Sequence, residues 1–379
     1  MTSHATRNKK SRKAIKKLRP WIKKLQDYGL FSVRENGKYG NKDFMSLALS
    51  ASLNKRSIEY ESSMGNTPSP RDFYHHTNSK LTTKAVESMF RRYIAEVVKL
   101  LKNFFHCSTF SIAIDKTDEP YWGEKENIYV TGGKREKSTN YAFRYLTATL
   151  VARGIEFTLY ARPLTKEDTN DALLVEEAIT TIQKLGIVVS RVLMDREFYN
   201  GKIIFLCKCL GVYYIIPLKK DSKFQRWAET FGPFPSLVKD YEINGEFTNL
   251  LVYEEINSKG EKEIFGFITN IEPDKIRMNA YEIVDFYRRR WAIENANKFQ
   301  DNFTIHTNTT NGIVRYFFFV LAALLHNFWV LVSLMAQVFS LGKVPLNMLK
   351  DVAKTILGLA PAPNYKHAQR KLWLEILVG

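Results

Sequence analysis

The order of apolar runs between residues 110 and 219 restricts the fold more than any other feature of the sequence. FSIAID (110–115) is a short apolar run that ends on an acid, which indicates a buried strand. Two further runs, 141–151 and 155–164, are joined by a tight ARG turn and predict a hairpin. The region therefore begins with three strands.

A helix, a strand, a second helix and a last strand follow. TNDALLVEEAITTIQKLG (169–186) has a Thr or Asn cap, apolar residues near helical spacing and a terminal Gly, which predict a helix. IVVSRVLMD (187–195) is another strand ending on an acid. A helix over roughly 200–210 and the strand VYYIIPLK (212–219) complete the series. This order predicts an α/β protein with a mixed sheet and helices packed on it.

Residues 220–278 interrupt this pattern. The alternating runs FTNLLVYEE and EIFGFITNI, separated by turn signals such as NSKG, predict a small antiparallel β insertion. A helix over about 279–300 then resumes the main domain. The first hundred residues look helical, with a turn-rich link at 65–79 that contains His75 and His76, and with helices predicted at about 12–28, 42–52 and 83–105.

The stretch 316–339 is uncharged and long enough to span a bilayer. It also carries His326, Asn327 and Gln337, and a helix inside a large core is apolar all round too. Because polar residues are costly inside a membrane, we expect a buried core helix and no membrane partner.

The charge of the chain indicates a polyanionic partner. It has 56 Lys and Arg against 39 Asp and Glu, a net charge of +17, and such a surplus favours nucleic acid or an anionic surface. Ten of the cations lie in residues 7–24, interleaved with Ile15, Leu18, Trp21 and Ile22. This segment is typical of a basic amphipathic helix or arm that contacts phosphates, and a flexible basic tail or surface helix fits equally well.

The three cysteines, Cys107, Cys207 and Cys209, include no C-x-x-C pair and no nearby His at ligand spacing. The pattern predicts free thiols in a reducing compartment and no structural zinc site.

Three acids stand out by position. Asp115 and Asp195 each end a predicted strand, and Glu294 lies within the predicted helix after the insertion. If the strands are neighbours, the two aspartates project side by side, and a helix packed across the sheet can deliver Glu294 to the same place. Converging carboxylates repel each other unless a cation neutralises them. Oxygen-only ligands suit Mg²⁺ or Mn²⁺, and two such ions about 3.5–4 Å apart support phosphoryl transfer.

The segment YRRRWAIENANK surrounds Glu294 with cations. Tyr287, Arg290, Glu294 and Lys298 fall on one helical stripe about 80° wide. An exposed face steadied by ion pairs one turn apart is one explanation. The other is that the Arg and Lys side chains beside the acids hold DNA phosphates.

These motifs resemble those of the DDE transposases of bacterial and archaeal insertion sequences. The resemblance is carried by IAIDKT (112–117), LMDREFYN (193–200) and Y-x2-R-x3-E, which is Tyr287, Arg290 and Glu294, and it runs from about residue 106 to 340. It is strongest with the branch that has a β-rich insertion between the second Asp and the Glu. The resemblance implies an RNase H-like core, a five-stranded mixed sheet flanked by helices.

The resemblance also implies the activity: cleavage at transposon ends and strand transfer into target DNA. It implies two Mg²⁺ (or Mn²⁺) ions per active site, with Asp115, Asp195 and Glu294 as ligands, and Tyr287 and Arg290 gripping the DNA end. The branch usually has a Lys seven positions after the Glu, where this chain has Asp301, and Lys298 is the candidate substitute. The predicted DNA-binding residues are Tyr287, Arg288, Arg289, Arg290 and Lys298.

The expected partners are the terminal inverted repeats and target DNA. A homodimer is expected in the DNA complex because two ends must be paired, and the expected location is the cytoplasm, at the nucleoid. Two alternatives stay open: a nuclease or resolvase of the same fold that does not join strands, and an inactive basic DNA-binding protein derived from a mobile element. The predicted domains are a helical basic DNA-binding domain (1–105), the catalytic core in two parts (106–219 and 279–340), the β insertion (220–278) and a helical C-terminal segment (341–379).

Other polar residues have competing explanations. Asp118 is close to Asp115 but lies beyond the predicted strand end, so Asp115 is favoured as the ligand. Glu197 is expected to cap the next helix, and Trp291 to pack in the core. His306 and Asn308 are expected to make local hydrogen bonds in a polar turn.

Overall fold

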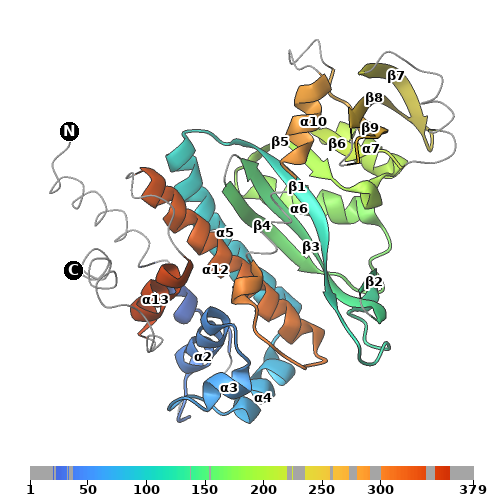
Figure 1. Ribbon diagram of the computed structural model, residues 1–379. Helices are drawn as coiled ribbons and strands as arrows, with labels where there is room; N and C mark the ends of the chain where they lie inside the picture. The colour runs from blue at the N-terminus through green and yellow to red at the C-terminus, as the bar shows by residue number, and fades with distance from the viewer. Residues whose placement is uncertain are drawn as a thin grey trace, which may run out of the picture.

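The computed structural model describes most of the chain, and the strands and helices below lie within it. The residues described are 20, 23–31, 33, 37–136, 138–152, 155–219, 224, 235–256, 259–272, 280–290, 300–338 and 346–358. Figure 1 shows helices α2 to α4 at one end of the molecule and strands β7 to β9 with helix α10 at the other end.

A single mixed sheet forms the centre of the molecule. Its central five strands run in the order β4-β3-β1-β5-β6, with β1, β5 and β6 parallel and β3 antiparallel to both β1 and β4. This is the predicted order of three strands, helix, strand, helix, strand. The bounds are β1 Thr109–Pro120, β3 Thr139–Ala152, β4 Ile155–Pro163, β5 Val188–Met194 and β6 Tyr213–Pro217. The strands are near-continuous apolar runs because helices cover both faces.

Strand β1 is longer than its apolar run. It continues to Pro120 because pairing with β3 extends from Ser111 opposite Val151 to Pro120 opposite Ala142. The prediction that the strand ends at Asp115 is therefore wrong for β1, and Asp118 lies within the strand. A further strand, β2 (Val130–Glu136), pairs with the start of β3 and was not predicted, since VTGGKRE has no apolar alternation.

The β insertion continues the central sheet. Strands β7 (Ser236–Ile243), β8 (Glu246–Ile256) and β9 (Lys262–Thr269) are antiparallel, as predicted. Strand β9 pairs with β6, with Ile215 opposite Thr269, so the sheet reaches nine strands.

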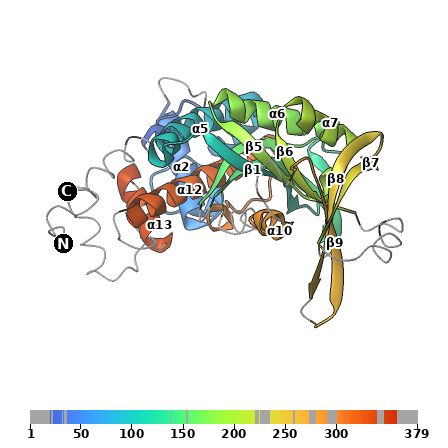
Figure 2. The same cartoon turned by 90° about the horizontal axis from the view of Figure 1, so that it is seen from above.

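Helices cover the two faces of the sheet. Figure 2 shows α6 (Asp171–Lys184) and α7 (Gly201–Cys209) on one side, and α10 (Ala280–Arg288) and α12 (Gly312–Val338) on the other. The predicted cap of α6 is confirmed: the Asn170 side chain accepts a hydrogen bond from the Ala172 N–H. Two short 3₁₀ helices, η1 (Arg196–Phe198) and η2 (Asp301–Phe303), follow β5 and precede α12.

Helix α12 is the long apolar helix that the sequence predicts. It is long and apolar enough to cross a membrane, but most of its side chains are buried within the protein, where it packs against α5 (Thr83–Phe105) and β4. Asn327 donates to the Thr158 carbonyl at 2.8 Å and accepts from the Thr158 N–H at 2.9 Å. Asn327 therefore binds the helix to the sheet, as a buried polar group in a core helix requires.

The N-terminal region differs from the prediction in two helices: α3 (Ile58–Ser62) was not predicted, and the predicted link at 65–79 is largely helical. Residues 70–80, predicted as part of a turn-rich link, form helix α4 (Pro70–Lys80), so His75 and His76 are helical. The reason is local: the Ser69 side chain caps the helix and Pro70 occupies its first turn. The other helices are α2 (Asn41–Asn54), α3 (Ile58–Ser62) and, at the C-terminal side, α13 (Leu346–Leu357). Most of the helix predicted at 12–28 lies outside the described residues.

Candidate active site

The two predicted strand-end aspartates lie side by side on the sheet. The parallel pairing of β1 with β5 runs to Ile114 opposite Met194, so Asp115 is the next residue on β1 and Asp195 directly follows the end of β5. Because side chains alternate along a strand, they share the face of Ala113 and Leu193, which pack in one cluster with Ile283 and Val284 of α10. The acids therefore lie on the face that α10 covers.

The surroundings of the Asp115 carboxyl disfavour its ionised form. Burial first, and then the neighbouring Asp195 carboxylate, raise the pKa of Asp115 from 3.8 to about 6, and Arg290 lowers it in part. The side chain is only 17% exposed. A buried acid beside a second acid is stabilised as an anion when a cation binds between them.

Arg290 and Tyr287 face the same place from the C-terminal end of α10. Arg290 Nη1 lies 3.9 Å from Asp115 Oδ1, and its guanidinium lies over the Tyr287 ring at 5.6 Å. Burial raises the pKa of Tyr287 to about 12, partly offset by Arg290, and its ring packs 4.6 Å from that of Phe267 in β9. Four predicted site residues are thus brought together.

The other predicted site residues are placed differently or not described. Arg288 forms an ion pair with Glu255 of β8, and Arg289 pairs with Asp285 at 3.6 Å on the exposed side of its own helix. Both are engaged away from Asp115. Glu294, Lys298 and Trp291 lie outside the described residues.

The donors that are described fit a hard divalent cation. Within the described part of the chain, no group of three or more His, Cys, Asp and Glu side chains could hold a metal ion. Asp115 and Asp195 provide two carboxylates, and Glu294, the third predicted ligand, is not described. The oxygen-only chemistry and the raised pKa of Asp115 both suit Mg²⁺ or Mn²⁺.

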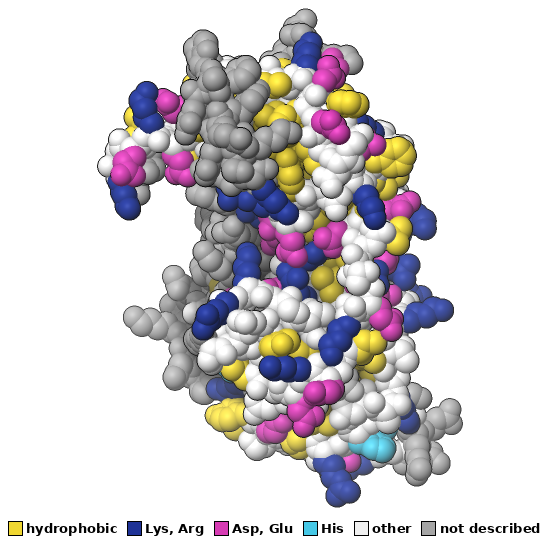
Figure 3. Space-filling model, turned by 90° about the vertical axis from the view of Figure 1, so that its right-hand side faces the viewer, with side chains coloured by type: hydrophobic (Ala, Val, Ile, Leu, Met, Phe, Trp, Pro, Cys, Tyr) yellow, Lys and Arg dark blue, Asp and Glu magenta, His cyan; other side chains and the backbone are white. Residues whose placement is uncertain are grey.

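A cavity of about 660 Å³ lies beside Asp195, between the insertion and α10. Aromatic rings from the insertion and three arginines contribute to its walls, namely Tyr253, Phe265, Phe267, Arg196, Arg288 and Arg290. Figure 3 shows a side of the molecule on which acidic side chains gather at mid height, with Lys and Arg above and below them. Aromatic and guanidinium groups next to paired acids suit a nucleic-acid strand.

Asp118 and Glu197 belong to ion pairs. Asp118 Oδ1 lies 2.6 Å from Arg144 Nε, and its other oxygen accepts from the Lys134 N–H at 2.8 Å. Asp115 is the better ligand candidate because both oxygens of Asp118 are already bonded to Arg144 and Lys134. The reason is not that Asp118 lies beyond the strand, since β1 includes it. The expected capping role of Glu197 is wrong, since the next helix, α7, is capped by the Asn200 side chain, which accepts the Lys202 N–H. Hydrogen bonds from Lys116 and Arg144 outweigh burial and lower the pKa of Glu197.

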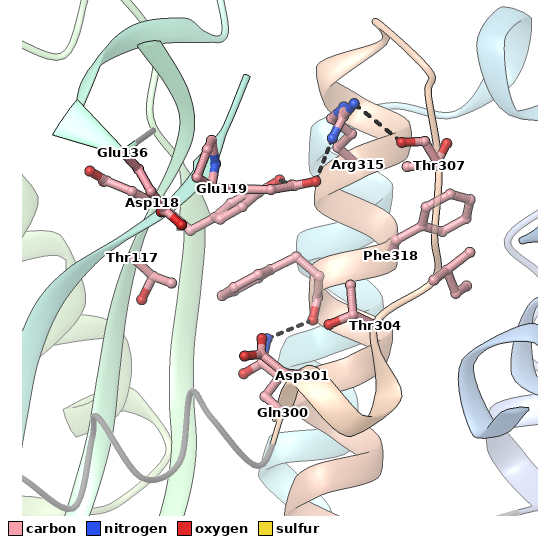
Figure 4. Close-up of a pocket in the computed structure, with 14 residues that line it drawn as sticks. Thr117, Asp118, Glu119, Glu136, Gln300, Asp301, Thr304, Thr307, Arg315 and Phe318 are labelled. Atoms are coloured by element: carbon pink, nitrogen blue, oxygen red, sulfur yellow. Dashed lines mark hydrogen bonds and ion pairs between the residues drawn. The ribbon is translucent and has the colours of Figure 1, made fainter. Parts of the chain in front are cut away.

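A second cavity, of about 310 Å³, lies between β1 and the start of α12 (Figure 4). Arg315 forms an ion pair with Glu119 here and donates to the Thr309 carbonyl at 2.6 Å. Asp301, at the position of the missing lysine, also lines the cavity, and burial raises its pKa. Lys116, Arg144, Glu119 and Arg315 were not predicted from the sequence as site residues. The backbone N–H of His306 donates to the backbone carbonyl of Arg56 at 3.3 Å, a contact far along the chain and not the local one expected.

The strand order β4-β3-β1-β5-β6, with helices on both faces, defines an RNase H-like core. A model of the family described as "Transposase DDE domain" matches residues 112–328, more than half of the chain. The chain belongs to this family of DDE transposases.

Solved structures support the fold. A cryo-EM structure of a piggyBac transposase synaptic complex with hairpin DNA is similar to this chain, with a TM-score of 0.53 and 13% sequence identity. The alignment covers 96% of this chain and 83% of that chain. At this identity the likeness concerns the fold alone. No curated protein matches the chain.

The raised pKa of Asp115 predicts a pH-dependent cost to stability in the metal-free protein. Between about pH 4 and pH 6 the native state binds more protons than the unfolded state, so the free energy of unfolding falls as pH rises through this window. Asp115→Asn removes this cost. Denaturant unfolding in EDTA should find the variant more stable than the parent by roughly 3 kcal/mol at pH 7, and the gap should close towards pH 4. A gap independent of pH would contradict the prediction.

Proposed function

We propose that this protein binds the ends of an insertion sequence and catalyses metal-dependent strand cleavage and strand transfer into target DNA. The observation that carries the proposal is the adjacency of Asp115 and Asp195 on neighbouring parallel strands, with Arg290 facing them. Membership of the DDE transposase family supports the class of reaction.

Asp115 and Asp195 would hold the divalent cations, with Glu294 as the third ligand. When bound, two Mg²⁺ or Mn²⁺ ions would stabilise the charge on the attacking and departing oxygens of an in-line displacement at phosphorus. Arg290 and Tyr287 would bind the phosphate of the DNA end, since both face the acids from α10. The buried setting of Asp115 excludes water from its carboxylate and strengthens its attraction for cations.

The DNA would lie along the cavity beside Asp195. Arg196 and Arg288 line that cavity together with aromatic rings, and Lys298 is proposed as a further phosphate contact. Residues 1–105, with ten cations in residues 7–24, would form the domain that recognises the terminal inverted repeats. A homodimer would pair the two ends, at the nucleoid in the cytoplasm. The similar piggyBac structure is a synaptic complex with DNA, which supports this arrangement.

Two assays test the proposal. Purified protein with Mg²⁺ should nick a duplex that carries the element's terminal repeat at the repeat boundary, and it should join a pre-cut end to a plasmid. Cutting without joined products would favour the nuclease or resolvase alternative. Binding without cutting, unchanged by Glu294→Gln, would favour the inactive DNA-binding protein.

A further inference from the structure

A charged cluster lies on the sheet face opposite Asp115. Lys116 Nζ lies 2.8 Å from Glu197 Oε1 and 2.9 Å from Asp171 Oδ1. Arg144 continues the chain of charges, with Nη2 3.2 Å from Glu197 Oε2 and Nε 2.6 Å from Asp118 Oδ1. The Lys116 side chain is only 7% exposed, so the pair is less screened by solvent than a surface ion pair. The cluster consists of Lys116, Asp118, Arg144, Asp171 and Glu197.

The cluster joins the two segments that carry the acids. Lys116 follows Asp115 directly on β1. Glu197 lies in η1 and donates its backbone N–H to Asp195 Oδ1 at 2.8 Å. The Glu197 N–H therefore orients the Asp195 carboxylate. Lys116, the chain neighbour of Asp115, in turn holds the Glu197 side chain in place.

The position of the cluster matches the point where the strand pairing ends. The ladder between β1 and β5 runs to Ile114 and Met194, one residue before the acids. Beyond that point β1 continues in pairing with β3, whereas the chain after β5 turns into η1. The Lys116–Glu197 ion pair spans these two diverging segments. It is therefore placed to set the separation of Asp115 and Asp195.

We propose that Lys116, Glu197 and Arg144 are positioning residues that hold Asp115 and Asp195 at the separation a divalent cation requires. This inference rests on the proposed function, because it takes the two aspartates as the metal-binding pair. Partners that orient metal ligands typically change metal affinity by about 10- to 100-fold when they are removed. An ion pair that only stabilises the fold would change the melting temperature and leave the metal affinity alone.

The test is calorimetric titration of the full-length protein with Mn²⁺, alone and without DNA. Glu197→Gln keeps the side-chain shape and removes the charge, and Arg144 keeps its partner Asp118. We expect the Kd for Mn²⁺ to rise at least about tenfold, with end cleavage recovering at saturating Mn²⁺. Lys116→Met should act in the same direction. Unchanged Mn²⁺ affinity in folded Glu197→Gln would overturn the inference.

Two further variants make the result specific. Lys208→Met breaks an ion pair of 2.9 Å between α7 and Glu246 of β8, and its Mn²⁺ affinity should equal that of the parent. The double variant Lys116→Met/Glu197→Gln should bind Mn²⁺ about as well as the weaker single variant, because both changes remove one shared interaction. Additive losses would show two independent effects and contradict the proposed pair.

Asp115→Asn separates this inference from the proposed function. Binding of Mn²⁺ by Asp115→Asn as tightly as by the parent would refute the proposed function itself. Loss of binding in Asp115→Asn together with normal binding in Glu197→Gln would leave the proposed function standing and refute only the positioning role.

Discussion

Asp195→Asn should reduce Mg²⁺-dependent cleavage of DNA ends by at least about 10³-fold, because loss of a metal ligand removes several kcal/mol of transition-state stabilisation. The fold should survive. In the parent, the role of Asp195 in local structure is to accept the Glu197 N–H at 2.8 Å, and the Asn side-chain oxygen can accept the same bond. Cleavage should therefore be lost without a fall in melting temperature.

Single-turnover cleavage of a labelled terminal duplex measures this effect. The matched control is Asp285→Asn, which changes an exposed carboxylate of α10 that pairs with Arg289, and it should cleave like the parent. Asp118→Asn tests the rival ligand: it should weaken the pair with Arg144 but retain far more cleavage than Asp195→Asn. Equal losses in Asp118→Asn and Asp195→Asn would contradict the assignment of Asp115 and Asp195 as the catalytic pair.

The order of strands and helices could be predicted from the sequence because the central strands are buried on both faces. A strand such as 110–115 is then an unbroken apolar run, bounded by turn residues, that local composition reveals. The end of β1 could not be predicted this way. Residues 116–119 are polar, and they are extended because they pair with the first half of β3, from Lys116 opposite Leu146 to Pro120 opposite Ala142.

The proposed site also has a part that the sequence could predict and a part that it could not. The adjacency of Asp115 and Asp195 follows from two strands that end on acids, since neighbouring parallel strands align their carboxyl ends. The contacts around them were not predictable, because Lys116 and Glu197 are 81 residues apart and neither is in an unusual local pattern. Helix α4 was missed for a different reason. Its sequence is rich in residues typical of turns, and one of them, Ser69, is the N-cap of the helix.

Arg315 is the buried cation on which the start of α12 depends, and its removal should cost more stability than any exposed substitution. Its side chain is 8% exposed and forms an ion pair with Glu119 of β1. It also donates to the Thr309 carbonyl at 2.6 Å and lies 4.7 Å from the Phe143 ring centre. Removing Arg315 leaves the Glu119 carboxylate without its cation, although Glu119 is 36% exposed and still accepts from the Tyr145 hydroxyl at 3.0 Å. Arg315→Met should therefore lower the free energy of unfolding by roughly 2–3 kcal/mol.

Denaturant unfolding with Arg289→Met as the exposed control measures the cost, and the control should lie within about 0.5 kcal/mol of the parent. Arg315→Lys should recover only part of the loss, because one ammonium group cannot reproduce the planar guanidinium contacts with Glu119 and the Thr309 carbonyl together. The double variant Arg315→Met/Glu119→Leu should be more stable than Arg315→Met alone, since it removes the stranded carboxylate. A double variant no better than the single would mean that lost packing against Phe143, rather than the unpaired charge, dominates the cost.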